Sequence, residues 1–246
     1  ASLIFKGGGT CLSKVYSDFN RLSEDLDFVI SVPVDTTRSQ RRAAIESIKE
    51  ILEKLPNTVP EVIISKAFEG HNESRQYIGH LEYPSVVIDK HERIKIEVGL
   101  REPLLIPAES GTAQTIATNP FSLQPLIPAF TVNAMALREI YAEKFRAALT
   151  RREPAIRDFF DLFHAFNKKK LNPHDPGFIN MVRTKILVPG NDPVDISIGK
   201  RLELDRQLKG QLKPVLRPGD FALFTLDKAF DIVRTMAEAI SAQDFE

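Results

Sequence analysis

The sequence predicts an α/β (α+β) fold, in which a mixed sheet with helices precedes a mostly helical C-terminal domain. Short stretches of alternating apolar residues, typical of strands, are confined to the first hundred residues. Longer stretches with apolar residues at helical spacing fill the second half. Between them, residues 103–128 hold five of the 16 prolines, which indicates an irregular connection. We therefore expect domains at 1–105 and 131–246, joined by a Pro-rich connection at 106–130.

Composition narrows the classes of protein to consider. With 43% hydrophobic residues the 246-residue chain can bury a sizeable core, and its 33 basic and 33 acidic residues cancel. A neutral chain does not coat nucleic acid by bulk charge, so any such contact needs a local basic patch. One cysteine, no membrane-length apolar run and no signal segment indicate a cytoplasmic protein that does not act at a membrane. The start at Ala1 suggests that a short native N-terminal element precedes the chain.

Local patterns predict the elements in order. Alternation predicts strands in four stretches: 25–30, 61–66, 85–89 and 93–98. Helical periodicity predicts helices in six stretches: 10–19, 39–55, 133–149, 154–167, 177–187 and about 219–241. No internal repeat or low-complexity tract interrupts them.

A glycine turn and a pair of acidic residues carry the first chemical signal. The turn Gly7-Gly8-Gly9-Thr10 follows an apolar run and precedes a helix, so its amides could meet a phosphate. Asp25 and Asp27 are two apart on a predicted strand and project from one face. Carboxylates held this close repel unless a cation lies between them, and hard oxygen ligands suit Mg²⁺. An ordinary turn and a solvated strand end are the alternatives.

The spacing of these features resembles a known family. The segment GGTCLSKVYSDFNRLSEDLDF is similar to the motifs of the AbiEii/AbiGii toxins, which belong to the nucleotidyltransferase superfamily with a DNA-polymerase-beta-like fold. The resemblance implies that Asp25, Asp27 and a third carboxylate bind Mg²⁺ or Mn²⁺. It also implies that Gly8, Gly9 and Thr10 contact the nucleotide. We expect Glu97, on the polar face of RIKIEV, to be the third carboxylate. Asp89 is its competitor, although its position before Lys90 suggests a hairpin turn. The alternative for Glu97 is a cross-strand ion pair with a basic neighbour, Lys95 or Arg93.

Lys144 is the most informative residue of the second half. It falls inside the apolar stripe of its helix, four after Ile140, and a buried lysine is costly unless an anion meets it. The functional interpretation is a lysine that holds a triphosphate, and snorkelling to solvent is the alternative. The family's Lys-x-x-Ala motif matches Lys144 and Ala147.

A second acidic pair follows Lys144. Asp158 and Asp161 lie three apart and off the apolar stripe of their helix. A family motif of the type Arg-Asp-aromatic-x-Asp-Leu implies that one of them orients or deprotonates the attacking hydroxyl. The alternative is a helix-surface ion pair between Arg157 and Asp161.

Weaker candidates complete the set. Lys14 matches a family lysine, and Ser23 lies two before Asp25 on the same strand, so both are candidates for nucleotide contact. Basic clusters at 168–170, 200–201 and 209–217 could guide an RNA backbone or be solvated surface. The five histidines lack metal-ligand spacing, and Cys11 is expected to be buried.

Together these residues predict an enzyme. We expect a Mg²⁺-dependent transfer of a nucleotidyl group from an NTP to an acceptor, with release of pyrophosphate and an active site between the two domains. The resemblance implies the toxin of a toxin–antitoxin or abortive-infection pair, an antitoxin partner and the tRNA 3′ end as acceptor. The alternatives are a small-molecule or protein acceptor, and a non-catalytic module that binds nucleotide or RNA.

Overall fold

The computed structural model of the protein describes residues 2–86, 88–168 and 171–242. Contacts divide the chain into two compact units. Unit 1 comprises Ala1–Tyr16 and Ser23–Met135, and unit 2 comprises Ser17–Leu22 and Ala136–Glu246. The short connection Ser17–Leu22 therefore groups with the later half of the chain, although elements of unit 1 precede and follow it.

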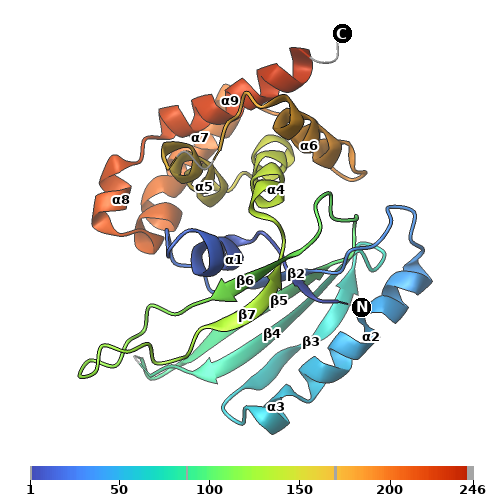
Figure 1. Cartoon of the computed structure of the whole chain (residues 1–246), viewed down its shortest axis with the longest axis vertical. Coiled ribbons are helices and arrows are strands. Elements are labelled where there is room, and N and C mark those ends of the chain that lie inside the picture. Colours follow the sequence, from blue (N-terminus) through green and yellow to red (C-terminus); the bar gives the residue numbers. More distant parts are fainter. Residues whose placement is uncertain (1, 87, 169–170, 243–246) are drawn as a thin grey trace. The chain divides into compact units, whose positions relative to one another are not determined.

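Unit 1 is built on a mixed sheet (Figure 1). Within the described residues the sheet has seven strands in the order β3-β4-β5-β2-β1-β7-β6. The strands are β1 Ile4–Phe5, β2 Leu26–Val29, β3 Ile63–His71, β4 Gln76–Pro84, β5 His91–Gly99, β6 Glu109–Ala113 and β7 Phe130–Ala134. The helical segments are α1 Gly9–Cys11, the π-helical turn η1 Leu12–Tyr16, α2 Arg38–Glu53 and α3 Leu55–Thr58. The predicted α/β architecture of the first half is thus confirmed.

Alternation along the strands separates an apolar face of the sheet from a polar one. Leu26 and Phe28 of β2 pack against a buried cluster that includes Ile45 of α2. Helix α2 begins at a capping box, in which Thr37 and Gln40 exchange hydrogen bonds, and it buries Ile45 completely. Because successive strand residues point to opposite faces, Asp27 projects away from this cluster. Asp27 and the side chains that share its face of the sheet therefore lie on the side opposite the apolar cluster.

Three expectations for unit 1 were wrong in detail. The predicted strand 85–89 lies in the bend between β4 and β5, and its Val86 is fully exposed, while Val87 lies outside the described residues. Asp89 is in this hairpin bend, as its position suggested. β6 lies within the region predicted to be irregular. Its sequence ESGTA is polar, and only its pairing with β7 makes it a strand. The helix predicted at 10–19 ends at Tyr16.

Unit 2 is helical, as predicted. Its elements are α4 Leu137–Thr150, α5 Ile156–Asn167, α6 Pro176–Leu187, α7 Ile198–Gln207, the turns η2 Leu208–Leu212 and η3 Lys213–Val215, α8 Pro218–Leu223 and α9 Leu226–Ala242. Helix α4 packs against α5, α6 and α9, and eleven of its 14 residues are buried. The helix predicted at 219–241 is two helices separated at Phe224, and α7 was not predicted. Along the described ranges, no helix is long and apolar enough to cross a bilayer.

Candidate active site

A register between two parallel strands brings two of the predicted carboxylates together. β2 pairs with β5 in parallel, and the Cα of Asp27 lies opposite that of Glu97. Directly opposed residues project from the same face of a sheet, and neighbouring strands are about 4.8 Å apart. Asp27 and Glu97 are both half-buried. The sheet thus joins residues that are 70 positions apart in the sequence.

Gly8 makes room for the carboxylate of Asp27. A Cβ atom at Gly8 would lie 2.0 Å from Oδ2 and 2.9 Å from Cβ of Asp27, far inside van der Waals contact. The backbone of Gly8 has φ −63° and ψ 173°, which any residue adopts. The glycine is therefore required by the lack of space for a side chain, and not by an unusual backbone angle. Gly9 follows as a buried first residue of α1.

Thr10 connects the glycine turn to the acidic strand. Its hydroxyl lies 2.9 Å from Oγ of Ser23 and donates a hydrogen bond to the carbonyl oxygen of Asp25. Thr10 is only 2% exposed, so these contacts hold the backbone at Asp25 in place. Lys14 is half-buried on η1, where its carbonyl oxygen accepts a hydrogen bond from the amide of Gln114.

Lys95, an expected ion-pair partner of Glu97, and Lys6, which had no predicted role, balance these carboxylates. Burial, followed by the charges of Glu97 and Asp25, raises the pKa of Asp27 against the opposing effect of Lys6 and Lys95. Burial would also raise the pKa of Glu97, but Lys6 and a 2.7 Å ion pair with Lys95 outweigh it and lower that pKa. The ion-pair alternative for Glu97 is therefore present, along one strand. Asp27 is the less well compensated carboxylate.

Asp25 and Asp27 suit a Mg²⁺ ion if other groups, such as the phosphates of a substrate, supply the remaining ligands. Within the described residues, no three His, Cys, Asp or Glu side chains are close enough to hold a metal ion. Mg²⁺ is commonly bound by one or two carboxylates together with phosphate oxygens of the substrate. The oxygen donors of Asp25 and Asp27, and the unrelieved repulsion at Asp27, fit that type of site.

Unit 2 holds the second group of predicted residues. Lys144 is 7% exposed, which excludes the snorkelling alternative, and its Nζ lies 2.7 Å from Oδ1 of Asp158 and 2.9 Å from Oδ2 of Asp161. Both aspartates are buried, although they lie off the apolar stripe of α5. Within the described residues, the ion pairs of Asp161 are with Arg21 and Lys144 and not with Arg157. Arg157 is exposed.

Two arginines complete this buried network. Arg21 binds Asp161 through two parallel hydrogen bonds of 2.8 and 2.9 Å, and Asn20 adds a third of 3.2 Å. The half-exposed Arg151 lies 3.0 Å from Oδ2 of Asp158. Three cations thus surround two carboxylates, which leaves a net charge of about +1 when all are ionised. Arg21 stood in the first motif without an assigned role, and no local pattern indicated its partner 140 residues later.

Protonation in this network follows from the pairing. Burial favours the neutral form of each group, yet Lys144 lowers the pKa of Asp158, and Arg21 and Lys144 hold the pKa of Asp161 well below its usual range. Burial likewise opposes the charge of Lys144, but Asp158 and Asp161 raise its pKa. All three side chains are therefore ionised at neutral pH. The predicted residues fall into two groups, one in each unit, and their joint action stays a prediction.

The structure contradicts one of the proposed RNA-guiding clusters, at 200–201. Lys200 is 5% exposed and donates hydrogen bonds to the carbonyl oxygens of Leu149 and Asp195, so it is not available at the surface. Its neighbour Arg201 pairs with Asp227. Lys169 and Lys170 lie outside the described residues. Cys11 is fully buried, as expected.

Comparison with known proteins identifies the fold and the family of the chain. No curated protein sequence matches the chain. Among solved structures, JHP933 from Helicobacter pylori superposes with a TM-score of 0.51 at 15% identity, covering 99% of this chain and 85% of that one. An inferred nucleotidyltransferase from H. pylori gives 0.52 at 14% identity, with 100% and 90% covered. These likenesses establish the fold. Residues 1–239 match the family profile of the nucleotidyl transferase AbiEii toxin of type IV toxin–antitoxin systems, and the chain therefore belongs to this family of nucleotidyltransferase toxins, which implies an antitoxin partner.

Proposed function

We propose that the chain transfers a nucleotidyl group from an NTP to the 3′ end of tRNA in a Mg²⁺-dependent reaction, and that an antitoxin restrains this activity. One observation carries the proposal. The Asp27 carboxylate is packed over Gly8 and opposite Glu97, where burial and like charges raise its pKa. A cation between acidic side chains relieves that repulsion, and family membership supplies the class of chemistry.

Asp25 and Asp27 are the residues that would hold Mg²⁺ together with the NTP. When bound, the ion supplies positive charge that neutralises the phosphates during transfer. Thr10 keeps Asp25 in place through its hydrogen bond to the backbone. Gly8 leaves space for Asp27, so its carboxylate can approach the turn.

The acceptor hydroxyl attacks the α-phosphorus, the bond from that phosphorus to the β-phosphate bridging oxygen breaks, and pyrophosphate leaves with the electron pair. Glu97, which the sequence predicted as the third metal ligand, is proposed instead as the acceptor of the hydroxyl proton, because no three carboxylates of the described residues form a metal site. Lys6 and Lys95 lower its pKa, so it is ionised and can accept a hydrogen bond from the attacking group at neutral pH.

The buried network of unit 2 is assigned to phosphate binding. Lys144 and the half-exposed Arg151 carry the surplus positive charge of the network. Asp158 is the better candidate for contact with a substrate, because one of its partners, Arg151, is half-exposed and can exchange. Asp161 is fixed by Arg21 and Lys144 at both of its oxygens, so we assign it to positioning.

Transfer from labelled NTPs tests the proposal. The protein is incubated with each α-labelled NTP, Mg²⁺ and total tRNA, or with candidate small molecules or proteins. We expect label on tRNA, loss of transfer in Asp27→Asn and Glu97→Gln, and wild-type rates in the controls Asp89→Asn and Glu92→Gln, which alter exposed carboxylates of the β4–β5 hairpin. Label on another acceptor would refute the tRNA assignment. Absence of transfer with every acceptor, or full toxicity of Asp25→Ala in cells, would favour a non-catalytic binding module.

A further inference from the structure

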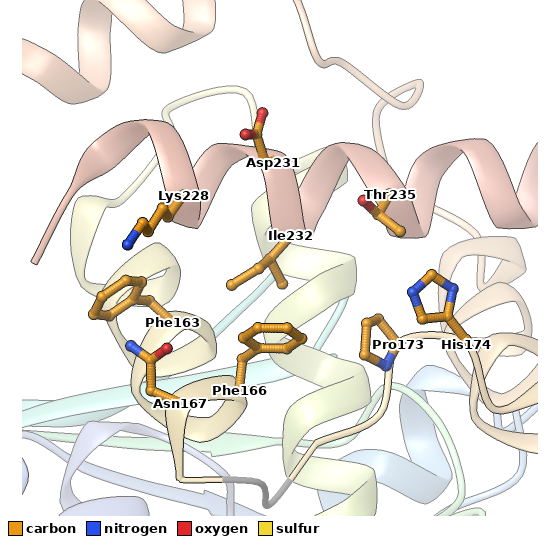
Figure 2. A pocket seen from close by; sticks show the side chains of 9 residues that line it. All are labelled: Phe163, Phe166, Asn167, Pro173, His174, Lys228, Asp231, Ile232 and Thr235. Carbon is orange, nitrogen blue, oxygen red and sulfur yellow. The ribbon is translucent and has the colours of Figure 1, made fainter.

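A cavity in unit 2 is lined by none of the residues that were assigned a role in the proposed transfer reaction. It has a volume of about 270 Å³ and opens between α5 and α9 (Figure 2). Phe163 and Phe166 of α5 face Ile232 of α9 across it, and Pro173, in the connection to α6, closes one end. Phe163, Ile232 and Pro173 are buried, whereas Phe166 is 43% exposed. The cavity therefore has an apolar floor and one aromatic ring that solvent can reach.

Polar groups surround this apolar floor. Asn167 follows Phe166 at the end of α5, Thr235 lies on α9, and His174 stands beside Pro173 (Figure 2). A carboxamide offers donors and an acceptor together, which complements the edge of a heterocyclic base. The rim can thus recognise a ring that is apolar on its faces and polar at its edge.

The cavity is lined by one basic and one acidic residue, Lys228 and Asp231. Asp231 is engaged by Arg234 at 2.9 Å. Lys228 is exposed and, within the part of the chain that the structure describes, has no ion-pair partner. Its ammonium group lies on the same side of the cavity as the Phe163 ring (Figure 2). Lys168, one residue after Asn167, is a further exposed cation near the end of α5. This arrangement favours a ligand whose ring enters the cavity and carries an anionic group.

We propose that this cavity binds a single unstacked nucleotide, with its base against Phe166 and Ile232 and its phosphate at Lys228. Ligand sites for whole drug-sized molecules have volumes of about 300–1,000 Å³, so a cavity at the lower limit suits one base rather than a long chain. Aromatic rings that stack on bases, next to basic groups that meet the backbone, are the usual means of binding unpaired nucleotides. The nucleotide is either free in solution or part of single-stranded RNA. Binding here does not require the proposed transfer reaction.

Binding measured in EDTA tests the assignment, because divalent cations are then absent. Wild-type protein is titrated with AMP, GMP, CMP, UMP, inorganic phosphate and a five-residue single-stranded RNA, by calorimetry and by the ring-proton NMR signals of histidine. The signal of His174, assigned with His174→Gln, should shift on binding. Phe166→Ala should weaken binding by about tenfold or more, because stacking on an aromatic ring contributes about 1–3 kcal/mol per base. Lys228→Gln should weaken binding severalfold and reduce its salt dependence by about one ion.

Matched controls separate the pocket from general effects. Phe121→Ala removes a 95% exposed ring and Lys54→Gln removes an exposed lysine, both in unit 1, so both variants should bind as wild type. Asp25→Ala should lose transfer and retain this binding, which distinguishes failure of the enzyme proposal from failure of this one. RNA that binds at least tenfold tighter than mononucleotides identifies an RNA subsite, and equal affinities identify a free nucleotide. Absence of binding by all probes, an unshifted His174 signal, or unchanged affinity in both pocket variants overturns the proposal.

Discussion

Replacing Gly8 with alanine tests the geometry on which the site depends. The added methyl would meet three atoms of Asp27, at 2.0 Å from Oδ2, 2.8 Å from Cγ and 2.9 Å from Cβ. Rotation of the Asp27 side chain can remove the first two contacts, and Oδ2 must then retreat by about 1.4 Å to reach an ordinary contact of 3.4 Å. The Cβ contact does not respond to this rotation, so the glycine turn itself must move by about 0.5 Å.

The expected cost is larger for function than for stability. Overpacking costs about 1–3 kcal/mol, which corresponds to roughly 2–12 °C in melting temperature for a chain of this size. A displacement of about 1 Å at a reacting centre can reduce the rate about 100-fold. We therefore expect Gly8→Ala to fold, to lose about two orders of magnitude in kcat/KM for transfer, and to bind Mn²⁺ more weakly.

A double-mutant cycle identifies the clash as the cause. In an Asp27→Ala background the Oδ2 and Cγ contacts are absent and the Cβ contact remains, so Gly8→Ala should lose part of its destabilisation. Gly219→Ala is the matched control, since nothing lies within 4 Å of its added Cβ atom. The reasoning is refuted if Gly8→Ala keeps wild-type Mn²⁺ affinity and kcat/KM within twofold, or if its cost in stability is the same in the Asp27→Ala background.

Three further predictions concern the buried charges. Lys144→Met leaves Asp158 and Asp161 without their shared cation, so its free energy of unfolding in denaturant at pH 7 should fall by about 3–5 kcal/mol. The control Lys209→Met, at an exposed lysine, should lose less than about 0.5 kcal/mol. Equal losses in the two variants would contradict the pairing. Burial, Glu97 and Asp25 raise the pKa of Asp27, so the folded wild type loses stability as pH rises through that pKa. Asp27→Asn should therefore melt above wild type at pH 8 in EDTA, with the difference shrinking toward pH 4, whereas a lower melting temperature at pH 8 would show that the carboxylate is well compensated. Burial would raise the pKa of Asp161, but Arg21 and Lys144 depress it, so its stabilisation is present above the unfolded pKa of about 3.9 and is lost as pH falls toward the folded value. Urea midpoints should fall between pH 4 and pH 2 in wild type and less steeply in Asp161→Asn, and parallel pH profiles would count against this role.

Local sequence was informative wherever a pattern alone decides the structure. The spacing from Gly8 to Asp27 indicated a glycine turn next to an acidic strand, and the structure places those two residues in contact. The position of Lys144 in an apolar stripe predicted its burial, because helical periodicity determines which face a residue occupies. Strands such as β6, whose residues are polar, had no such pattern and depend on their partners.

By itself the sequence determined the residue types of both groups, the α/β character of the first half and the helical character of the second. Only the tertiary structure decided the partners. The parallel register of β2 and β5 sets Glu97 opposite Asp27, and the connection Ser17–Leu22 brings Arg21 to Asp161. The physical reason is that a charge in a local pattern does not specify its counter-ion. Arg21 and Asp161, 140 residues apart, pair because burial makes an unpaired charge costly and the packed elements offer one partner within reach. Asp27 and Glu97, 70 residues apart, are both acidic, and the register of their strands brings them together.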